Sequence, residues 1–132
     1  MSIDNIADFL SKIKNAYMRK KGFVECPYFK VLEDLCSVLK EANFISDFKS
    51  FKPKEGFFKM LHVNLLYKDG KPSLLGLRRV SRSGKRVYVG YKDVRSVLGG
   101  LGISVLTTSR GFLSGNEARK RKLGGEVVCE IW

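Results

Sequence analysis

The sequence predicts an α+β protein built from two small lobes, and three observations carry the prediction. Apolar residues recur at helical spacing in two early segments, residues 6–17 and 31–42. From Phe44 onward the hydrophobic period changes to two, which is typical of strands. A chain of 132 residues can also bury a core, either as one domain or as two lobes that share an interface. We expect the lobes to span residues 1–68 and 69–132.

The first lobe is expected to have the order α-β-α-β-β. Its first helix has Asp4 and Asn5 as candidate N-caps. Its second helix follows Pro27 and ends at Asn43, which suits the C′ position because Asn tolerates a left-handed backbone. Asp69–Gly70 is a strong turn signal close to the lobe boundary. The strands expected in this lobe are Phe23–Cys26, Ile45–Phe51 and Phe58–Tyr67.

The second lobe is expected to be mostly β. A helix of one or two turns is expected over Asp93–Leu98, closed by glycines. Ser114-x-x-Glu117 has the form of a capping box and opens a second short helix, Glu117–Leu123, closed by Gly124. The strands expected in this lobe are Leu74–Val80, Arg86–Tyr91, Ile103–Thr108 and Glu126–Trp132.

Charge is the outlying property of the composition. The chain has 25 basic and 13 acidic residues, a net charge of +12. Residues 78–132 hold 12 basic and 4 acidic residues and so carry +8 of this charge, which leaves +4 for residues 1–77. Such an excess points to a polyanionic partner, with nucleic acid first and an anionic membrane second.

Membrane insertion and secretion are disfavoured by the sequence. No apolar run approaches the ~18–20 residues that span a bilayer. Asp4 and Asp8 lie where a signal peptide would carry positive charge. Cys26, Cys36 and Cys129 are odd in number, widely spaced and embedded in apolar sequence, which favours buried reduced thiols over disulfides or a metal site. We therefore expect a soluble protein of a reducing, cytoplasmic compartment, without cofactor or metal.

Two basic segments favour RNA contact. Residues 78–86 hold five cations around a Ser-Gly turn and lead to Tyr88, which either stacks on a base or sugar or belongs to the core. Near the C-terminus, the hydroxyl cluster of residues 107–109 precedes Arg110–Gly111, a basic run over 119–122 and a Gly124–Gly125 pair. Short hydroxyls can meet 2′-hydroxyls and phosphates with little loss of side-chain entropy.

Glu126 has two readings that the residues alone leave equally weighted. It is either an edge-strand carboxylate that faces water or pairs with an arginine, or an acceptor for a base amino group that also orients its neighbours. Catalysis is not expected, although a small hydrolase using Ser109 or Thr108 with His62 is an alternative. A sequence-tolerant binder of DNA or RNA is another.

Four blocks of the sequence resemble the bacterial-type small-subunit ribosomal protein eight family. They read IDNIADFLSKIKNAY, RVSRSGKRVY, GLGISVLTTSRG and EARKRKLGGEVVC. The resemblance covers nearly the whole chain. It implies an N-terminal α/β lobe, a β-rich C-terminal lobe and a structural role in the small ribosomal subunit.

The resemblance also implies partners and contacts. The partner would be the central domain of 16S-type rRNA, bound early in assembly and chiefly by the C-terminal lobe, beside neighbouring proteins five and seventeen. The protein would be a monomer within a cytoplasmic ribosome, an organellar ribosome being the alternative. The RNA-binding residues expected from the resemblance and the basic segments together are Thr107, Thr108, Ser109, Arg110, Gly111, Tyr88, Glu126, Gly125, Lys30, Lys14, Asn15, Arg79, Arg82 and Arg86.

The chain departs from the family pattern at several positions. Thr107 keeps the hydroxyl of the usual serine but adds a methyl group, and Ser83 stands where proline is common. After Pro27, where small hydroxyls are usual, the chain has Tyr28 and Phe29, so the N-terminal contact is expected to use aromatic stacking.

Overall fold

The computed structural model describes residues 3–132 and has the α+β composition that the sequence predicts. The chain divides into two compact units, with the boundary between Leu74 and Leu75. This boundary lies beyond the expected 68/69 division because the chain after β3 forms a further small hairpin that belongs to the first unit. The first unit contains α1 (Ile3–Met18), β1 (Phe23–Pro27), α2 (Lys30–Glu41), β2 (Ile45–Phe51), β3 (Met60–Leu65), β4 (Tyr67–Lys68) and β5 (Lys71–Pro72). The second contains β6 (Leu77–Arg79), β7 (Tyr88–Val89), β8 (Ile103–Thr108), β9 (Gly111–Ser114), α3 (Gly115–Lys120) and β10 (Gly125–Ile131), with 3₁₀ turns at Tyr91–Asp93 and Leu98–Gly100.

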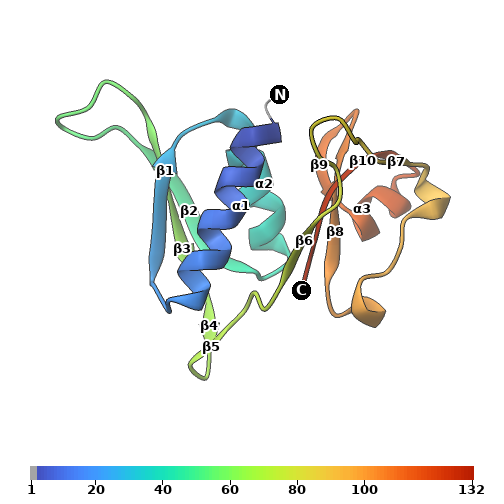
Figure 1. Cartoon of the computed structure of the whole chain (residues 1–132), viewed down its shortest axis with the longest axis horizontal. Coiled ribbons are helices and arrows are strands. Elements are labelled where there is room, and N and C mark those ends of the chain that lie inside the picture. Colours follow the sequence, from blue (N-terminus) through green and yellow to red (C-terminus); the bar gives the residue numbers. More distant parts are fainter. Residues whose placement is uncertain (1–2) are drawn as a thin grey trace. The chain divides into compact units, whose positions relative to one another are not determined.

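In the first unit, two helices cover one face of an antiparallel sheet of order β1-β3-β2 (Figure 1). The strands alternate, so that Val24, Leu61 and Val63 are buried while Phe23 and Glu25 on the opposite face are exposed. Buried Tyr17 of α1 donates its hydroxyl to Phe44 O (2.5 Å) and accepts from Leu66 N (3.1 Å). Burial raises the pKa of Tyr17, which keeps it a neutral donor.

The helix ends are set by local backbone chemistry. Asn43 adopts φ 64° after α2, and Phe44 N donates to Leu39 O, so the predicted C′ role of Asn43 is confirmed. Asn43 N also donates to Lys40 O. The same pair of hydrogen bonds ends α1, where Lys20 has φ 56°, and α3, where Lys122 has φ 57°. At the other end of α1 the prediction was wrong, because Ile3 is already helical and neither Asp4 nor Asn5 precedes the helix. The residue before Ile3 lies outside the described part of the chain.

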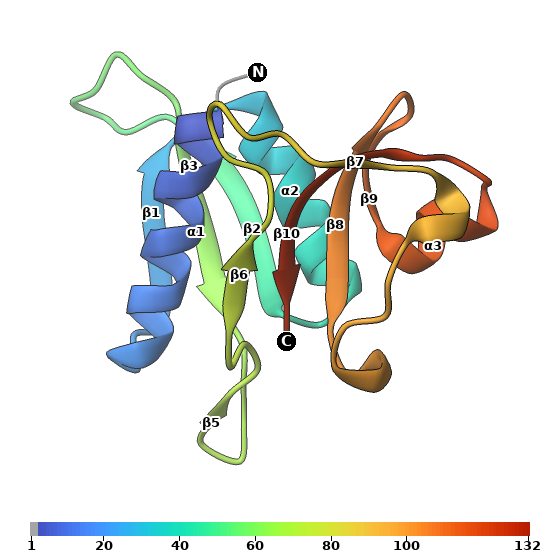
Figure 2. The same cartoon turned by 45° about the vertical axis from the view of Figure 1, so that its right-hand side comes forward.

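Near the end of the first unit, one strand prediction needs correction and one turn prediction is confirmed. The strand expected from Phe58 begins at Met60, which leaves Phe58 in the β2–β3 connection. The Asp69–Gly70 turn is confirmed, with both residues at positive φ (53° and 76°) between β4 and β5. Figure 2 shows this hairpin as a narrow extension, with the turn at its far end.

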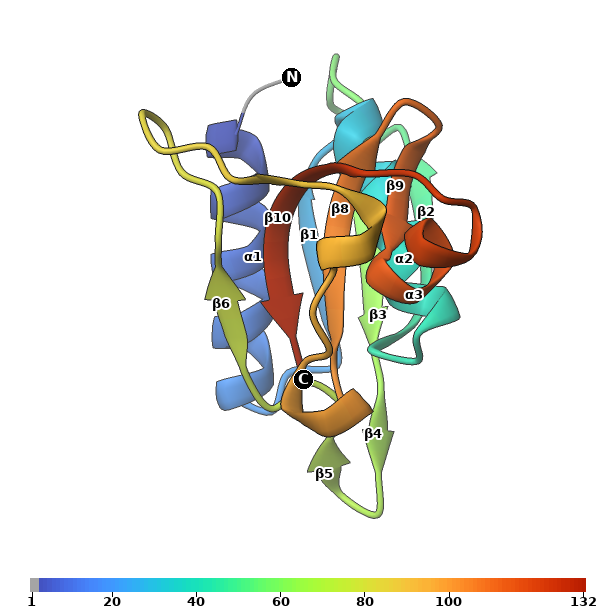
Figure 3. The ribbon, with the colours of Figure 1, turned by 90° about the vertical axis from the view of Figure 1, so that its right-hand side faces the viewer.

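The second unit is built around β10. Its sheet has the order β6-β10-β8-β9, visible across Figure 3, and β7 also pairs with β10. Val94, Leu106, Ala118 and Val127 form the core on the side of α3, with Val80, Val89 and Leu113 packed against them. Because β6 and β7 pair with one edge of β10 and β8 with the other, β10 is a central strand.

Several expected elements of the second unit are shorter or different. Leu75 N and Gly76 N both donate to Trp132 O, and a Cβ on Gly76 would lie 2.3 Å from the Trp132 ring, so the ladder starts only at Leu77. The strand expected over residues 86–91 is reduced to β7, because the chain turns at Gly90 into a 3₁₀ turn.

The two predicted helices also change. No helix spans residues 93–98, because Val94 and Val97 have an extended backbone, which β-branched side chains favour. Each of the two side chains is buried. Ser114 does cap α3, its Oγ accepting from Glu117 N at 3.3 Å. The helix ends at Lys120, before the expected Leu123, and a Cβ on Gly124 would lie 2.5 Å from Val89 O.

Candidate nucleic-acid interface

A cross-strand row of side chains crosses β10 on the face away from α3. Glu126 lies directly opposite Tyr88 of β7 and Thr107 of β8, and Thr107 lies opposite Phe112 of β9. Directly opposed residues of antiparallel strands point to the same face of a sheet. We call these four residues the β10 row. The register brings together three residues that the sequence predicts as contacts and adds Phe112, which no sequence signal had singled out.

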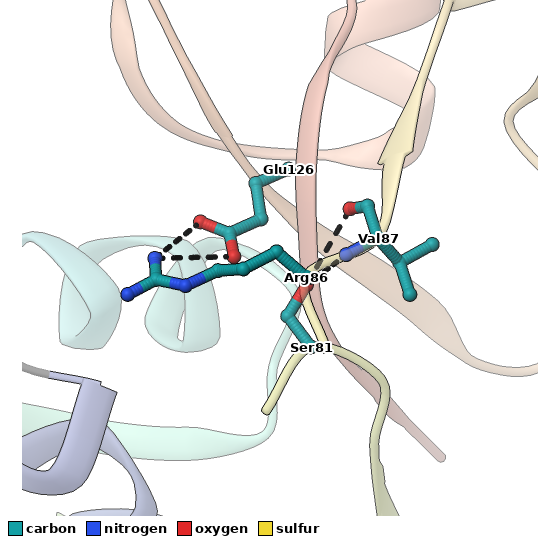
Figure 4. A network of polar contacts seen from close by, with 4 residues as sticks. All are labelled: Ser81, Arg86, Val87 and Glu126. Carbon is teal, nitrogen blue, oxygen red and sulfur yellow. Dashed lines mark hydrogen bonds and ion pairs between the residues drawn. The ribbon is translucent and has the colours of Figure 1, made fainter. Parts of the chain in front are cut away.

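Glu126 of the β10 row is buried and forms an ion pair with the more exposed Arg86, which lies outside the row (Figure 4). Arg86 Nη1 lies 3.4 Å from each carboxylate oxygen of Glu126, whose residue is 6% exposed. The pairing with an arginine in the first reading is thus confirmed, whereas its edge position is wrong, because Glu126 is buried in a strand paired on both sides. The Arg86 side chain remains 40% exposed, so part of its guanidinium faces outward.

The segment that carries Arg86 is held in place by Ser81 (Figure 4). Buried Ser81 accepts from Val87 N through its Oγ (2.9 Å) and donates to Val87 O (3.4 Å). Val87 O also accepts from Val127 N at 2.9 Å. These bonds hold residues 81 and 87 together beside β10. They therefore fix the backbone from which the side chains of Arg86 and Tyr88 project. Tyr88 is 69% exposed, so it is a surface ring and not a core residue.

The hydroxyl cluster divides into three different roles. Thr107 Oγ1 is buried and has no hydrogen-bond partner among the described residues. Thr108 Oγ1 is occupied within the β8–β9 turn, donating to Gly111 O (2.8 Å) and accepting from Arg110 N (3.1 Å). Ser109 is exposed at the turn, beside exposed Arg110. Of the three hydroxyl residues, only Ser109 is exposed at the protein surface.

Two glycines allow this arrangement. Gly111 closes the β8–β9 turn with φ 95°, a conformation that L side chains rarely adopt. A Cβ on Gly125 would lie 2.1 Å from Thr107 O, so β8 and β10 approach each other closely only because residue 125 is glycine. The predicted Gly125 therefore supports the register of the β10 row.

The predicted basic residues of the second unit are not equally available. Arg82 and Lys85 face each other across the Ser83–Gly84 turn and are exposed. Arg79 of β6 is half-buried opposite Cys129. Arg78, which precedes it, pairs with Glu130 at 2.8 Å. Arg119 of α3 donates to Val94 O, and Arg121, just after α3, pairs with Glu117 (3.1 Å). Lys120 and Lys122 are exposed as well.

The first unit carries the remaining predicted contacts. Lys14 and Asn15 are exposed on α1. Asn15 also lines a groove of about 520 Å³ beside β1, whose other polar lining residues are Lys12, Arg19, Lys21 and Glu25. Lys30 pairs with Glu33 (3.3 Å) and Asp34 (3.1 Å), and these hydrogen bonds, chiefly the one to Asp34, raise the pKa of Lys30. Its charge is therefore largely balanced within α2.

Of the groups considered for catalysis and metal binding, His62 is held by neighbouring side chains and the three cysteines are buried. His62 Nδ1 lies 2.8 Å from Glu25 Oε2 and its Nε2 lies 3.0 Å from Asn64 Oδ1, on the exposed sheet face of the first unit. Cys26, Cys36 and Cys129 are free and buried, and burial raises the pKa of Cys129 to about 12. Among the side chains of residues 5–132, no three of His, Cys, Asp or Glu gather as a metal site. None of the helices described is long and apolar enough to cross a membrane.

Comparison with known proteins gives one consistent family. Residues 4–132 match the model of the family described as Ribosomal protein S8. The small ribosomal subunit protein uS8 of Oleidesulfovibrio alaskensis is 44% identical over 132 residues, covering all of both chains. Those of Nitratidesulfovibrio vulgaris and Solibacter usitatus are 42% and 41% identical, again over the whole of each chain.

Proposed function

Because this chain belongs to the ribosomal protein S8 family, a family of structural proteins of the small ribosomal subunit and not of enzymes, we propose that it binds the central domain of 16S-type rRNA. In this proposal it stabilises an irregular stem of that domain early in subunit assembly. The observation that carries the proposal is the β10 row, in which β-sheet register aligns Tyr88, Glu126 and Thr107 across three strands.

The second unit supplies chemistry suited to RNA shape. The exposed Tyr88 ring can stack on a base or sugar, and the exposed part of Arg86 can donate to a phosphate while Glu126 fixes its orientation. Ser109 presents a short hydroxyl at the tip of the β8–β9 turn, where a 2′-hydroxyl in the shallow minor groove of an A-form helix can reach it. Thr108 acts indirectly, by holding the turn that presents Ser109.

Affinity in this proposal comes mainly from the net charge of +12. Each phosphate neutralised by a lysine or arginine releases counterions, so binding weakens steeply with salt. Exposed Arg82, Lys85 and Arg110 are the best-placed cations of the second unit. In the first unit, Lys14 and the groove beside Asn15 provide a second basic surface for RNA. Lys30 contributes less, because Glu33 and Asp34 already balance it.

The same proposal places the protein as a monomer in a cytoplasmic ribosome beside small-subunit proteins five and seventeen. Assembly of small subunits with and without this chain tests the neighbours directly. We expect proteins five and seventeen to join central-domain particles faster or more tightly when the chain is present. Unchanged incorporation of both would contradict this part of the proposal.

A competition titration tests the central claim. The full chain is titrated with a central-domain rRNA stem and with a regular duplex of equal length, across a series of salt concentrations. We expect a preference for the stem that persists as salt rises, because hydroxyl and stacking contacts are not screened. Equal affinities that collapse together with salt would instead identify a sequence-tolerant binder driven by charge alone.

A further inference from the structure

The connection between β2 and β3 carries two adjacent aromatic rings on its surface. Phe57 is 93% exposed and Phe58 is 79% exposed, although large apolar side chains are usually buried. The connection, residues 52–59, reads KPKEGFFK, and we call it the Phe57–Phe58 loop. Figure 1 shows it reaching past the end of the sheet of the first unit. The paired rings therefore lack cover within their own unit.

The loop has a defined base and a defined corner. Gly56 N donates to Pro53 O (3.3 Å), which closes a turn with Lys54 and Glu55 at its corner. At its return limb, Lys59 O accepts from Tyr28 N (3.0 Å), and Lys59 Nζ lies 4.3 Å from the centroid of the Tyr28 ring. Phe57 and Phe58 lie between this turn and the contacts of Lys59 with Tyr28. The backbone that carries the two rings is therefore fixed on both sides.

The charge around the rings indicates an anionic partner. Lys52, Lys54 and Lys59 are exposed and the only acid of the loop is Glu55, a local balance of three positive charges to one negative. Among the described residues, none of these lysines is in an ion pair with a carboxylate. A purely apolar protein surface would have to desolvate these ammonium groups, whereas a nucleic acid offers phosphates to the lysines and base faces to the rings.

We propose that the Phe57–Phe58 loop stacks on unpaired nucleotides of the RNA that this chain binds. The nature of the partner rests on the proposed function, but the loop contributes none of the residues assigned to the β10 row or the β8–β9 turn. Stacking requires bases that are not already paired, so the contact belongs at a bulge, an internal loop or a single-stranded junction. The lysines would hold the backbone on either side of the stacked bases.

The test compares three double variants of the full chain on central-domain rRNA without other proteins. Phe57→Ala/Phe58→Ala removes the rings, Phe57→Leu/Phe58→Leu keeps apolar bulk without an aromatic face, and Phe57→Tyr/Phe58→Tyr keeps the face. We expect about a ten-fold loss of affinity for both the Ala and Leu pairs, the effect of roughly one stacked base, and near-wild-type affinity for the Tyr pair. Chemical probing of unpaired bases is expected to reveal nucleotides that lose protection only in the Ala and Leu variants.

Several outcomes would overturn the inference. Wild-type affinity for the Ala pair would do so, as would rescue by the Leu pair, which would indicate apolar contact with a protein surface instead. Urea unfolding of each variant serves as the folding control, and unchanged midpoints are expected because the rings are exposed.

Failure of the proposed function gives a different pattern. A wild-type protein without preference for the stem over a duplex would refute specific rRNA binding. The loop is then tested on single-stranded RNA against duplex RNA with the same three variants. A loss confined to the Ala and Leu variants on the single strand supports base stacking, and equal affinities of all variants refute it.

Discussion

In the second unit, strand register aligns the candidate contact residues with one another. In the first unit, the candidate contact residues lie on separate elements and are not aligned by strand pairing. In the second unit, Glu126 aligns Tyr88 and Thr107 through strand pairing, and Gly125 permits the close approach. In the first, Lys14 and Asn15 lie on a helix surface and the Phe57–Phe58 loop projects from strand ends. The site of the second unit is therefore rigid and intolerant of backbone change. The contacts of the first unit are independent, so one residue can be lost without disturbing the others.

The largest difference between the units is expected from a change of one glycine. Gly125→Ala adds a Cβ about 2.1 Å from Thr107 O, so β8 and β10 must separate. We expect a loss of about 3 kcal/mol in the free energy of unfolding and loss of selective RNA binding. Urea unfolding and the stem titration measure both effects. Gly22→Ala in the first unit is the matched control, since no atom lies within 4 Å of its added Cβ; equal stability of the two variants would undo the comparison.

The Arg86–Glu126 pair tests whether Glu126 of the β10 row acts together with Arg86. Glu126→Ala leaves the guanidinium without its partner, and we expect about 2 kcal/mol of lost RNA-binding free energy. A double-mutant cycle with Arg86→Ala should give a coupling energy of about 1 kcal/mol on the stem. The Arg78–Glu130 pair offers the comparison, because it is also held by β10 but lies outside the row. Additive effects of Arg86 and Glu126 would mean that they act independently.

Two neighbouring hydroxyls are expected to separate stability from binding. Thr108→Val removes both hydrogen bonds inside the β8–β9 turn, which should lower the free energy of unfolding by about 1 kcal/mol. Ser109→Ala removes an exposed hydroxyl, so stability should hold while affinity for the stem falls by about 1 kcal/mol and affinity for a duplex stays nearly constant. Thermal unfolding together with the titration distinguishes these roles; equal losses on both RNAs would remove specificity from Ser109.

The smallest effect is expected at Lys30. Because Glu33 and Asp34 balance its charge, Lys30→Ala should change the salt dependence of RNA binding less than Lys14→Ala does. For Lys14→Ala we expect the slope of log affinity against log salt to fall by about 0.9, the value for one phosphate contact. Binding isotherms at several salt concentrations measure both slopes. A larger change for Lys30 would show that RNA displaces its carboxylate partners.

Local signals in the sequence were sufficient for much of the fold. Asn43 and the Ser114–Glu117 box act within one turn of the chain, and the strand over residues 103–108 matches its prediction. Signals that depend on distant partners were insufficient. Val94 and Val97 have helical spacing, yet each is buried separately in an extended segment.

The same distinction applies to the candidate site. The sequence identified Tyr88 and Glu126 as individual residues, but only strand register aligns them and adds Phe112. The internal use of the Thr108 hydroxyl and the burial of the Thr107 hydroxyl also depend on tertiary contacts. Phe58 was assigned to the strand that alternates through Leu61, Val63 and Leu65, but β3 begins only at Met60, which leaves Phe58 exposed in the connection.

The helix ends at Lys20 and Lys122 have a consequence for how the protein could be altered. Both lysines have a left-handed backbone conformation, which costs about 1 kcal/mol at each residue. Glycine would adopt the same conformation without this strain. A redesign guided by thermal stability alone would replace them with glycine and remove two of the 25 basic residues. Thermal stability and affinity for a polyanion are thus opposed at these two residues. A variant selected for heat resistance would have a smaller positive charge and a weaker attraction for RNA.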